Sequence, residues 1–218
     1  MEFALTQIEA RVLGCLVEKE LATPEYYPLT VNALISACNQ KSNRDPVLVV
    51  AEADVVDALD SLRFQRLAHQ SAEGVRAARY CHNLEGLLRL DRPELAILAE
   101  LLLRGPQTVG ELRSRAERMQ AFDDLAAVEE ALAALAEREP PLVVRLPRQP
   151  GRKEQRYAHL FAGPPELTEE ESSPQAQVRG RVSVEHERLA ALEAEVAALR
   201  GELAELRAQL AAFRAQFE

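Results

Sequence analysis

The sequence predicts a mainly helical α+β fold in which one order of elements occurs twice and a long amphipathic helix follows. Residues 6–84 and 92–160 each show the order helix, short strand, helix, helix and two-stranded β-hairpin. The amino acids also repeat, as the alignment of residues 9–16 with residues 94–101 shows. This order of elements belongs to the winged-helix variant of the helix-turn-helix. We therefore expect two tandem winged-helix domains.

The first repeat begins with a capping box, in which Thr6 and Glu9 each satisfy a free backbone N–H group of the other. Its first helix should end before Pro24, because the residue that precedes a proline disfavours helix. The next elements are a short strand, two helices and the two strands of a hairpin, predicted at about 29–30, 31–40, 51–65, 67–71 and 75–82.

The second repeat follows the same plan. Pro93 stands where the first turn of a helix tolerates proline, and Gly105 and Pro106 end that helix after Leu103. The short strand, two helices and hairpin strands that follow are predicted at about 108–109, 110–118, 125–137, 142–146 and 155–160.

The composition changes after Phe161, where proline, glutamate and serine replace apolar residues. Such a stretch cannot offset the entropy cost of becoming ordered, so we predict a flexible linker. The expected division into two domains, a linker and an oligomerisation helix is 1–90, 91–162, 163–181 and 182–218.

An unbroken heptad pattern predicts a coiled coil at the end of the chain. Its core positions are Leu189, Leu192, Val196, Leu199, Leu203, Leu206, Leu210, Phe213 and Phe217. The flanking charges favour a parallel homodimer, because an antiparallel pair would place Glu195 against Glu202 and Arg200 against Arg207. Leucine at both core positions specifies the number of helices loosely, so a trimer or tetramer is an alternative. Packing of the helix on its own globular part is another.

Composition and residue spacing also predict what the protein does not do. Charged residues interrupt every apolar run well before membrane-spanning length, so we expect a cytoplasmic protein without a membrane partner. The 3 cysteines are expected to be reduced, buried thiols. Neither a metal-ligand spacing nor a phosphate-binding glycine loop nor a nucleophile elbow occurs. We therefore expect no catalytic residue, no metal, no cofactor and no enzymatic activity.

The distribution of charge bears on nucleic-acid binding. The net charge of −9 opposes a nucleic-acid partner, but residues 164–218 hold 6 basic and 11 acidic side chains and so carry much of it. In a DNA-binding winged helix the third helix enters the major groove. Both predicted third helices are acidic, which disfavours that pose; they carry Glu52, Asp54, Asp57 and Asp60, and Glu129, Glu130 and Glu137.

Basic and polar side chains gather instead in the loop between the second and third helices of the first repeat, in the second repeat's hairpin, and near that hairpin. The candidate nucleic-acid-binding residues are Asn39, Gln40, Lys41, Ser42, Asn43, Arg44, Arg113, Arg115, Arg118, Arg145, Arg148, Arg152, Lys153 and Arg156. The alternative is that these are solvated loop charges without a partner.

Several motifs resemble the YceH family of bacterial proteins. They are Leu5-Thr6-x-x-Glu9-Ala10-Arg11-Val12-Leu13-Gly14, Glu18-Lys19, the run 23–30 and the run 39–46. The resemblance covers about residues 5–162 and extends to the tail. It implies a tandem winged-helix fold and implies no biochemical activity. The motif at 39–46 is either a contact surface or a device that shapes the turn between two helices.

Two functions of different classes follow from these observations. The first is a dimeric DNA-binding or transcription-regulator-like protein that contacts double-stranded DNA through the basic loop and hairpin. The second is a protein–protein interaction scaffold, in which the acidic third helices and the coiled coil bind other proteins.

Overall fold

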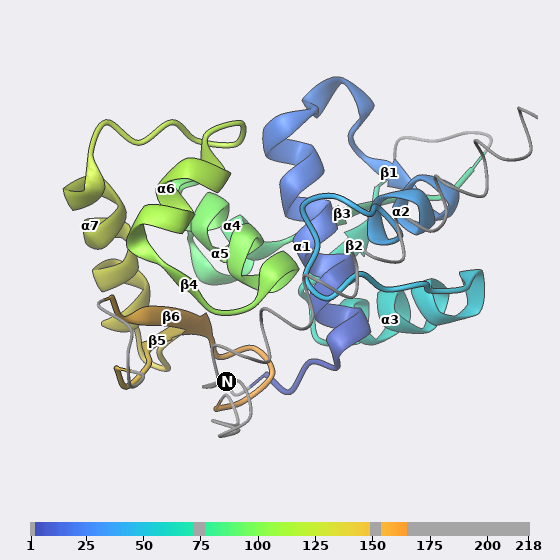
Figure 1. Cartoon of the computed structure of the whole chain (residues 1–218). Helices are drawn as coiled ribbons and strands as arrows, with labels where there is room; N and C mark the ends of the chain where they lie inside the picture. Colours follow the sequence, from blue (N-terminus) through green and yellow to red (C-terminus); the bar gives the residue numbers. More distant parts are fainter. Residues whose placement is uncertain (1–2, 72–76, 149–153, 165–218) are drawn as a thin grey trace, which may run out of the picture. The chain divides into compact units, whose positions relative to one another are not determined.

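The repeat predicted from the sequence is present in the computed structural model, which describes residues 3–71, 77–148 and 154–164 (Figure 1). These residues form a mixed α+β body with small antiparallel sheets. The heptad residues Leu189 to Phe217 and most of the predicted linker lie outside the described residues, as do Arg152 and Lys153.

Each half contains a helix, a short strand, two helices and a hairpin, in the same order. The elements of the first half are α1 (Gln7–Ala22), a 3-10 turn (Pro24–Tyr26), β1 (Leu29–Thr30), α2 (Val31–Cys38), α3 (Glu52–Phe64), β2 (Ala68–Gln70), β3 (Arg79–His82) and α4 (Leu84–Leu88). Those of the second half are α5 (Arg92–Arg104), β4 (Gln107–Thr108), α6 (Val109–Ala116), α7 (Leu125–Ala136), β5 (Val143–Arg145) and β6 (Arg156–His159).

The two sheets share one topology and one register. The strand orders are β1-β3-β2 and β4-β6-β5, and all neighbouring strands are antiparallel. Leu29 of β1 lies opposite Tyr80 of β3, and Gln107 of β4 lies opposite Tyr157 of β6 in the same way. The internal repeat of the sequence is therefore a repeat of structure.

The capping box predicted at Thr6 is confirmed. The backbone N–H of Thr6 donates to the Glu9 carboxylate at 2.6 Å, and the Glu9 N–H donates to the Thr6 hydroxyl at 3.2 Å. Asp91 and Glu94 form the same reciprocal pair at the start of α5. Both halves therefore begin their first helix by satisfying its free N–H groups in the same way.

Three local predictions need correction. The short strand of the second half is 107–108, not 108–109, because the Thr108 hydroxyl caps α6 and makes Val109 its first helical residue. The helices α2 and α6 end at Cys38 and Ala116, each two residues before the predicted end. The single-turn helix α4 follows the first hairpin and is not predicted by any periodic pattern, because it spans only five residues.

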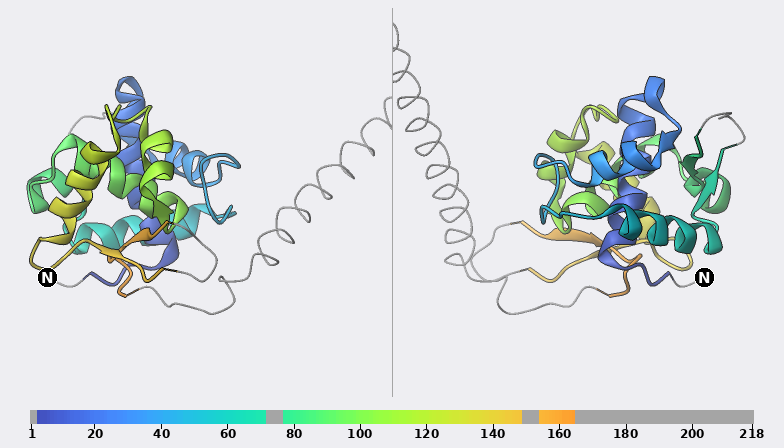
Figure 2. Two further views of the ribbon diagram at one scale, coloured as in Figure 1. Left: turned by 60° about the vertical axis from the view of Figure 1, so that its left-hand side comes forward. Right: turned by 90° about the vertical axis from the view of Figure 1, so that its right-hand side faces the viewer.

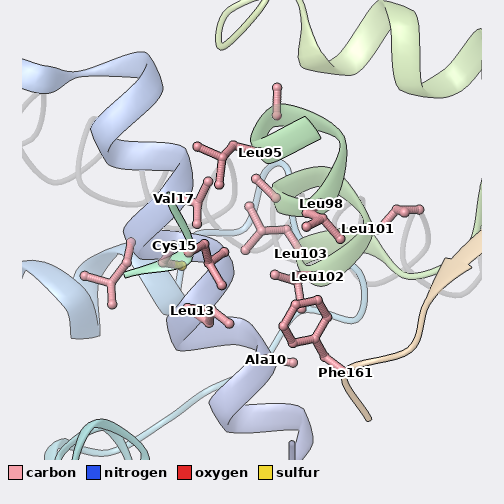
Figure 3. Packing of buried hydrophobic residues seen from close by; sticks show 14 of the residues in the cluster. Ala10, Leu13, Cys15, Val17, Leu95, Leu98, Leu101, Leu102, Leu103 and Phe161 are labelled. Atoms are coloured by element: carbon pink, nitrogen blue, oxygen red, sulfur yellow. The ribbon is translucent and has the colours of Figure 1, made fainter. Parts of the chain in front are cut away.

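The core of the molecule lies between α1 and α5, the first helices of the two halves. The two helices make extensive contact, and their buried residues belong to one hydrophobic cluster that spans both halves. Figure 3 shows Leu13 and Val17 of α1 facing Leu98 and Leu102 of α5. Every residue from Glu9 to Glu18 and from Glu94 to Leu103 is buried. The two halves therefore share one core.

Gly14 allows this close approach of the two helices. A Cβ at position 14 would lie 3.0 Å from the Cβ of Leu102 and 3.0 Å from the side chain of Leu103. Gly110 at the start of α6 offers a contrast, because an added Cβ there would meet nothing within 4 Å.

We predict opposite effects of alanine at these two glycines. Gly110→Ala should raise the free energy of unfolding by about 0.5–1 kcal/mol, because alanine loses less backbone entropy in a helix. Gly14→Ala gains the same term but crowds Leu102 and Leu103, at a cost of about 1–3 kcal/mol, and should lower it. Urea denaturation of both variants measures the difference; equal stabilisation by the two would contradict close packing of α1 against α5 at Gly14.

Candidate functional site

The loop between α2 and α3 contains the distinctive 39–46 motif, and Asn39 closes its base. The Asn39 side-chain amide donates to the Val50 carbonyl at 3.0 Å, and its oxygen accepts from the Val50 N–H at 2.8 Å. Pairing of this kind fixes the two ends of the loop against each other. Asn39 therefore shapes the turn between the two helices.

Arg44 is buried at the centre of the loop. Its guanidinium donates to both carboxylate oxygens of Glu18, at 2.6 and 3.3 Å, and to the Ala37 carbonyl at 3.1 Å. The Arg44 side chain is fully buried, and that of Glu18 is nearly so. Arg44 was predicted to contact nucleic acid; it is instead part of the core, since a side chain held this way cannot reach a phosphate.

The Glu18 carboxylate is ionised because of this partner. Burial alone would raise the pKa of Glu18, but the hydrogen bond and charge of Arg44, and then those of Lys19, lower that pKa below its usual value. Burying an ion pair of this kind costs the free energy of desolvating both charges. Removing one partner destabilises the folded state, because the other charge then stays buried without its partner.

The same loop also joins the first half to the second. The Asn43 side-chain oxygen accepts from Arg104 of α5, and the Asp45 N–H donates to the Leu103 carbonyl at 3.0 Å. On the other side, Arg11 of α1 donates to the Pro46 carbonyl at 2.6 Å. The motif therefore connects the loop to both central helices, which is a structural role.

A pair of cysteines lies beside this ion pair. The Cys38 thiol of α2 is 3.8 Å from the Cys15 sulfur of α1, and Arg44 approaches the Cys15 sulfur at 3.5 Å. The hydrogen bond to Cys15 and burial both raise the pKa of the Cys38 thiol. Both residues are buried free thiols, as predicted, whereas Cys81 is only half-buried.

Three of the candidate arginines of the second half bind acceptors within the protein. Arg113 donates to the carbonyls of Phe122 and Asp123, at 3.2 and 2.7 Å. Arg115 donates to Gln107 at 2.8 Å and to Glu111 at 3.3 Å. Arg156 donates to the Pro106 carbonyl at 3.3 Å. These contacts hold loops and strands in place and reduce the positive charge available to an anion.

The other described candidates are exposed or half-buried. Lys41 and Ser42 are exposed at the tip of the first loop, Gln40 is half-buried against Arg44, and Arg118, Arg145 and Arg148 are exposed in the second half. Lys41, Ser42, Arg118, Arg145 and Arg148 therefore stay predicted nucleic-acid contacts.

An exposed apolar surface on α3 was not predicted as a site. Phe64 and Val56 are 92% and 38% exposed, and Val49 just before the helix is 93% exposed. The sequence does contain a sign of it, because position 64 falls opposite the core positions 55, 59 and 62 on a helical wheel and position 56 falls at the edge of that core side. Figures 1 and 2 show α3 along the outside of the first half.

The histidines at the ends of the last strands are held by local contacts. In the first half, the His82 backbone N–H donates to the Tyr27 hydroxyl at 2.8 Å, and the His82 ring contacts Glu20 of α1. In the second half, burial lowers the pKa of His159 to about 4. In the described ranges no group of three or more histidine, cysteine or acidic side chains is placed to hold a metal ion. Nor is any helix there long and apolar enough to cross a membrane.

We predict that Arg44 is essential for stability. Arg44→Ala should lower the free energy of unfolding by about 3–5 kcal/mol, because it leaves the Glu18 carboxylate buried without its main partner. Lys41→Ala, in the exposed part of the same loop, should change it by less than about 0.5 kcal/mol. Combining Arg44→Ala with Glu18→Gln should recover part of the loss, which a double-mutant cycle by chemical denaturation measures. Equal stability of Arg44→Ala and Lys41→Ala would refute a core role for Arg44.

Comparison with known proteins gives consistent matches over most of the chain. The family model described as "Protein of unknown function, DUF480" matches residues 5–152. The UPF0502 protein of Geobacter metallireducens is 68% identical over 197 residues, which cover 90% of each chain. That of Geobacter sulfurreducens is 64% identical over the same length and share. The UPF0502 protein of Pelobacter propionicus is 63% identical over 163 residues, 75% of this chain and 74% of the relative.

The matched region contains the capping box, the 39–46 motif, the first half of the repeat and the second half through β5. The resemblance to the YceH family that the sequence motifs indicate is consistent with these matches. The chain therefore belongs to the DUF480 family, and the bacterial UPF0502 proteins are its relatives.

Proposed function

We propose that the chain is a non-enzymatic tandem winged-helix protein that acts by binding a protein partner, with α3 as a contact element. The support for the winged-helix part is the element order and the shared strand order of the two sheets. In DNA-binding proteins of this fold the third helix contacts the target. The third helices of this chain are α3 and α7.

The observation that carries the proposal is the chemistry of the exposed side of α3. Phe64 is 92% exposed there, among the carboxylates of Asp57 and Asp60. Apolar side chains within an acidic surface favour a protein over DNA, because phosphates repel carboxylates and do not bury a phenylalanine. The burial of Arg44 and the internal hydrogen bonds of Arg113 and Arg115 also reduce the support for a phosphate-binding surface.

DNA binding is the second candidate, and one observation favours it. Arg145 and Arg148 are exposed at the end of β5, beside the hairpin tip that carries Arg152 and Lys153 in the sequence. A winged helix uses this hairpin on the DNA backbone or in the minor groove. A parallel dimer through residues 182–218, which the heptad pattern supports, would bring two such hairpins into one assembly.

We predict that neutralising α3 removes partner binding, whereas neutralising α7 does not. The variant is Asp54→Asn, Asp57→Asn and Asp60→Asn; the matched control is Glu129→Gln and Glu130→Gln on α7 with Glu137→Gln at its C-cap. Affinity capture with the tagged full chain should recover a polypeptide that the α3 variant loses by at least about tenfold and the α7 variant retains.

The same preparations should be mixed with fragmented genomic DNA at about 150 mM salt. We expect no enriched sequence. Enrichment of a few DNA sites, together with polypeptide capture that the α3 variant does not reduce, would contradict protein docking and establish the DNA-binding candidate.

A further inference from the structure

The outward side of α3 forms one continuous stripe. At 100° per residue, Ala53, Val56, Asp57, Asp60 and Phe64 fall within about a 100° arc, and we call this set the α3 outer face. The core positions lie on the opposite side of the helix; they are Val55, Ala58, Leu59 and Leu62, all buried. Contacts of α3 with other described elements are mainly with α1, α2 and β2, so they leave the outer face uncovered by those elements.

The second half shows that the fold does not require apolar residues at this face. Residues 55–62 align with residues 128–135, so Val56 corresponds to Glu129 and Phe64 corresponds to Glu137. Both glutamates are exposed, Glu129 on α7 and Glu137 at its C-cap. Glutamate is an ordinary residue for an exposed helix position, whereas phenylalanine there is unusual. The fold itself therefore does not require the apolar pair on α3.

The charges of α3 define the chemistry of the partner. Four carboxylates lie on the helix, at Glu52, Asp54, Asp57 and Asp60, and all four are exposed. The opposing charge within α3 is Arg63, which binds Asp60 at 3.0 Å. A surface with this excess of carboxylates attracts lysine and arginine side chains and repels nucleic acid.

The spacing of the apolar residues indicates the form of the partner. Val56 and Phe64 are eight residues apart, which is about 12 Å along the helix. An amphipathic helix places apolar side chains at i, i+4 and i+7 along one side, which matches this span. Charged residues at the edges of such a helix would meet the carboxylates that flank the apolar pair.

We propose that the α3 outer face docks a basic amphipathic helix of a partner protein, with apolar side chains against Val56 and Phe64 and lysine or arginine against Asp57 and Asp60. This inference rests on the proposed function and adds the partner's chemistry. It also makes the two halves unequal: the first half carries the docking helix, whereas the second half carries the same element with glutamate in place of its apolar residues.

The test is site-specific photo-crosslinking of the full chain in bacterial cells. The photoreactive p-benzoylphenylalanine replaces Phe64 in one form and Glu137, at the C-cap of α7, in the matched control. We expect polypeptide adducts at position 64 at least about tenfold above those at position 137. Peptide mapping of the adduct should place the crosslink in an apolar segment flanked by lysine and arginine.

A second form keeps Val56, Phe64 and the carboxylates of α3 in place and carries the crosslinker at Ala53. The crosslinker at Ala53 should give an adduct that Val56→Glu with Phe64→Glu reduces at least about tenfold, and thermal melting should show that this double variant folds. Leu125→Glu, which changes an exposed apolar residue of α7 (47% exposed), should leave the adduct unchanged.

Several outcomes would overturn the inference, and they separate it from the proposed function. An adduct at position 64 with an acidic or extended segment of another protein would agree with protein docking but contradict a basic helix as the partner. An adduct with a second copy of this chain, or yields that are equal at positions 64 and 137, removes the α3 outer face as the docking site. Adducts with nucleic acid alone contradict the proposed function itself.

Discussion

The packing of α1 against α5 is the interaction on which the rest of the structure depends. Each helix is buried around its whole circumference, whereas a helix in a small domain usually buries only one side. Each half covers one side of its own first helix. The other side is covered by the first helix of the other half, at a distance that Gly14 permits. Because neither helix would be fully buried without the other, we expect the two halves to fold as one body.

The buried ion pair of Arg44 and Glu18 gives the long α2–α3 loop a structural role beside this helix pair. Arg44 reaches α1 and α2, Asn43 reaches α5, and Asn39 closes the loop at its base. The loop therefore holds the start of α3 in place relative to the core. The outward side of α3 takes no part in these contacts, and its exposed residues include Val56 and Phe64 together with carboxylates. The structural motif and the proposed docking surface are thus neighbouring parts of one arrangement.

Much of the fold follows from local patterns in the sequence. The capping pair of Thr6 and Glu9, the proline at 24 and the glycine and proline at 105–106 place the ends of α1 and α5 to within a residue or so. Two features could not be predicted in this way. The roles of Arg44 and Arg113 depend on acceptors that lie 26 and 10 residues away in the sequence, and a basic loop residue looks the same whether it is exposed or buried. The exposure of Phe64 could be inferred from its helical position, but only a comparison with Glu137 in the second half shows that the fold does not require it.

The central claim is that α1 and α5 form one cooperative core, and native-state hydrogen exchange tests it most directly. The slowest amides of Leu13 and Leu16 in α1 and of Leu98 and Leu101 in α5 are followed at increasing urea concentrations. A shared core predicts that all four exchange with the same free energy of opening and the same dependence on urea, both equal to those of global unfolding. If the amides of α5 open at a lower free energy while those of α1 stay protected, the two halves are independent domains, and the claim of a shared core is wrong.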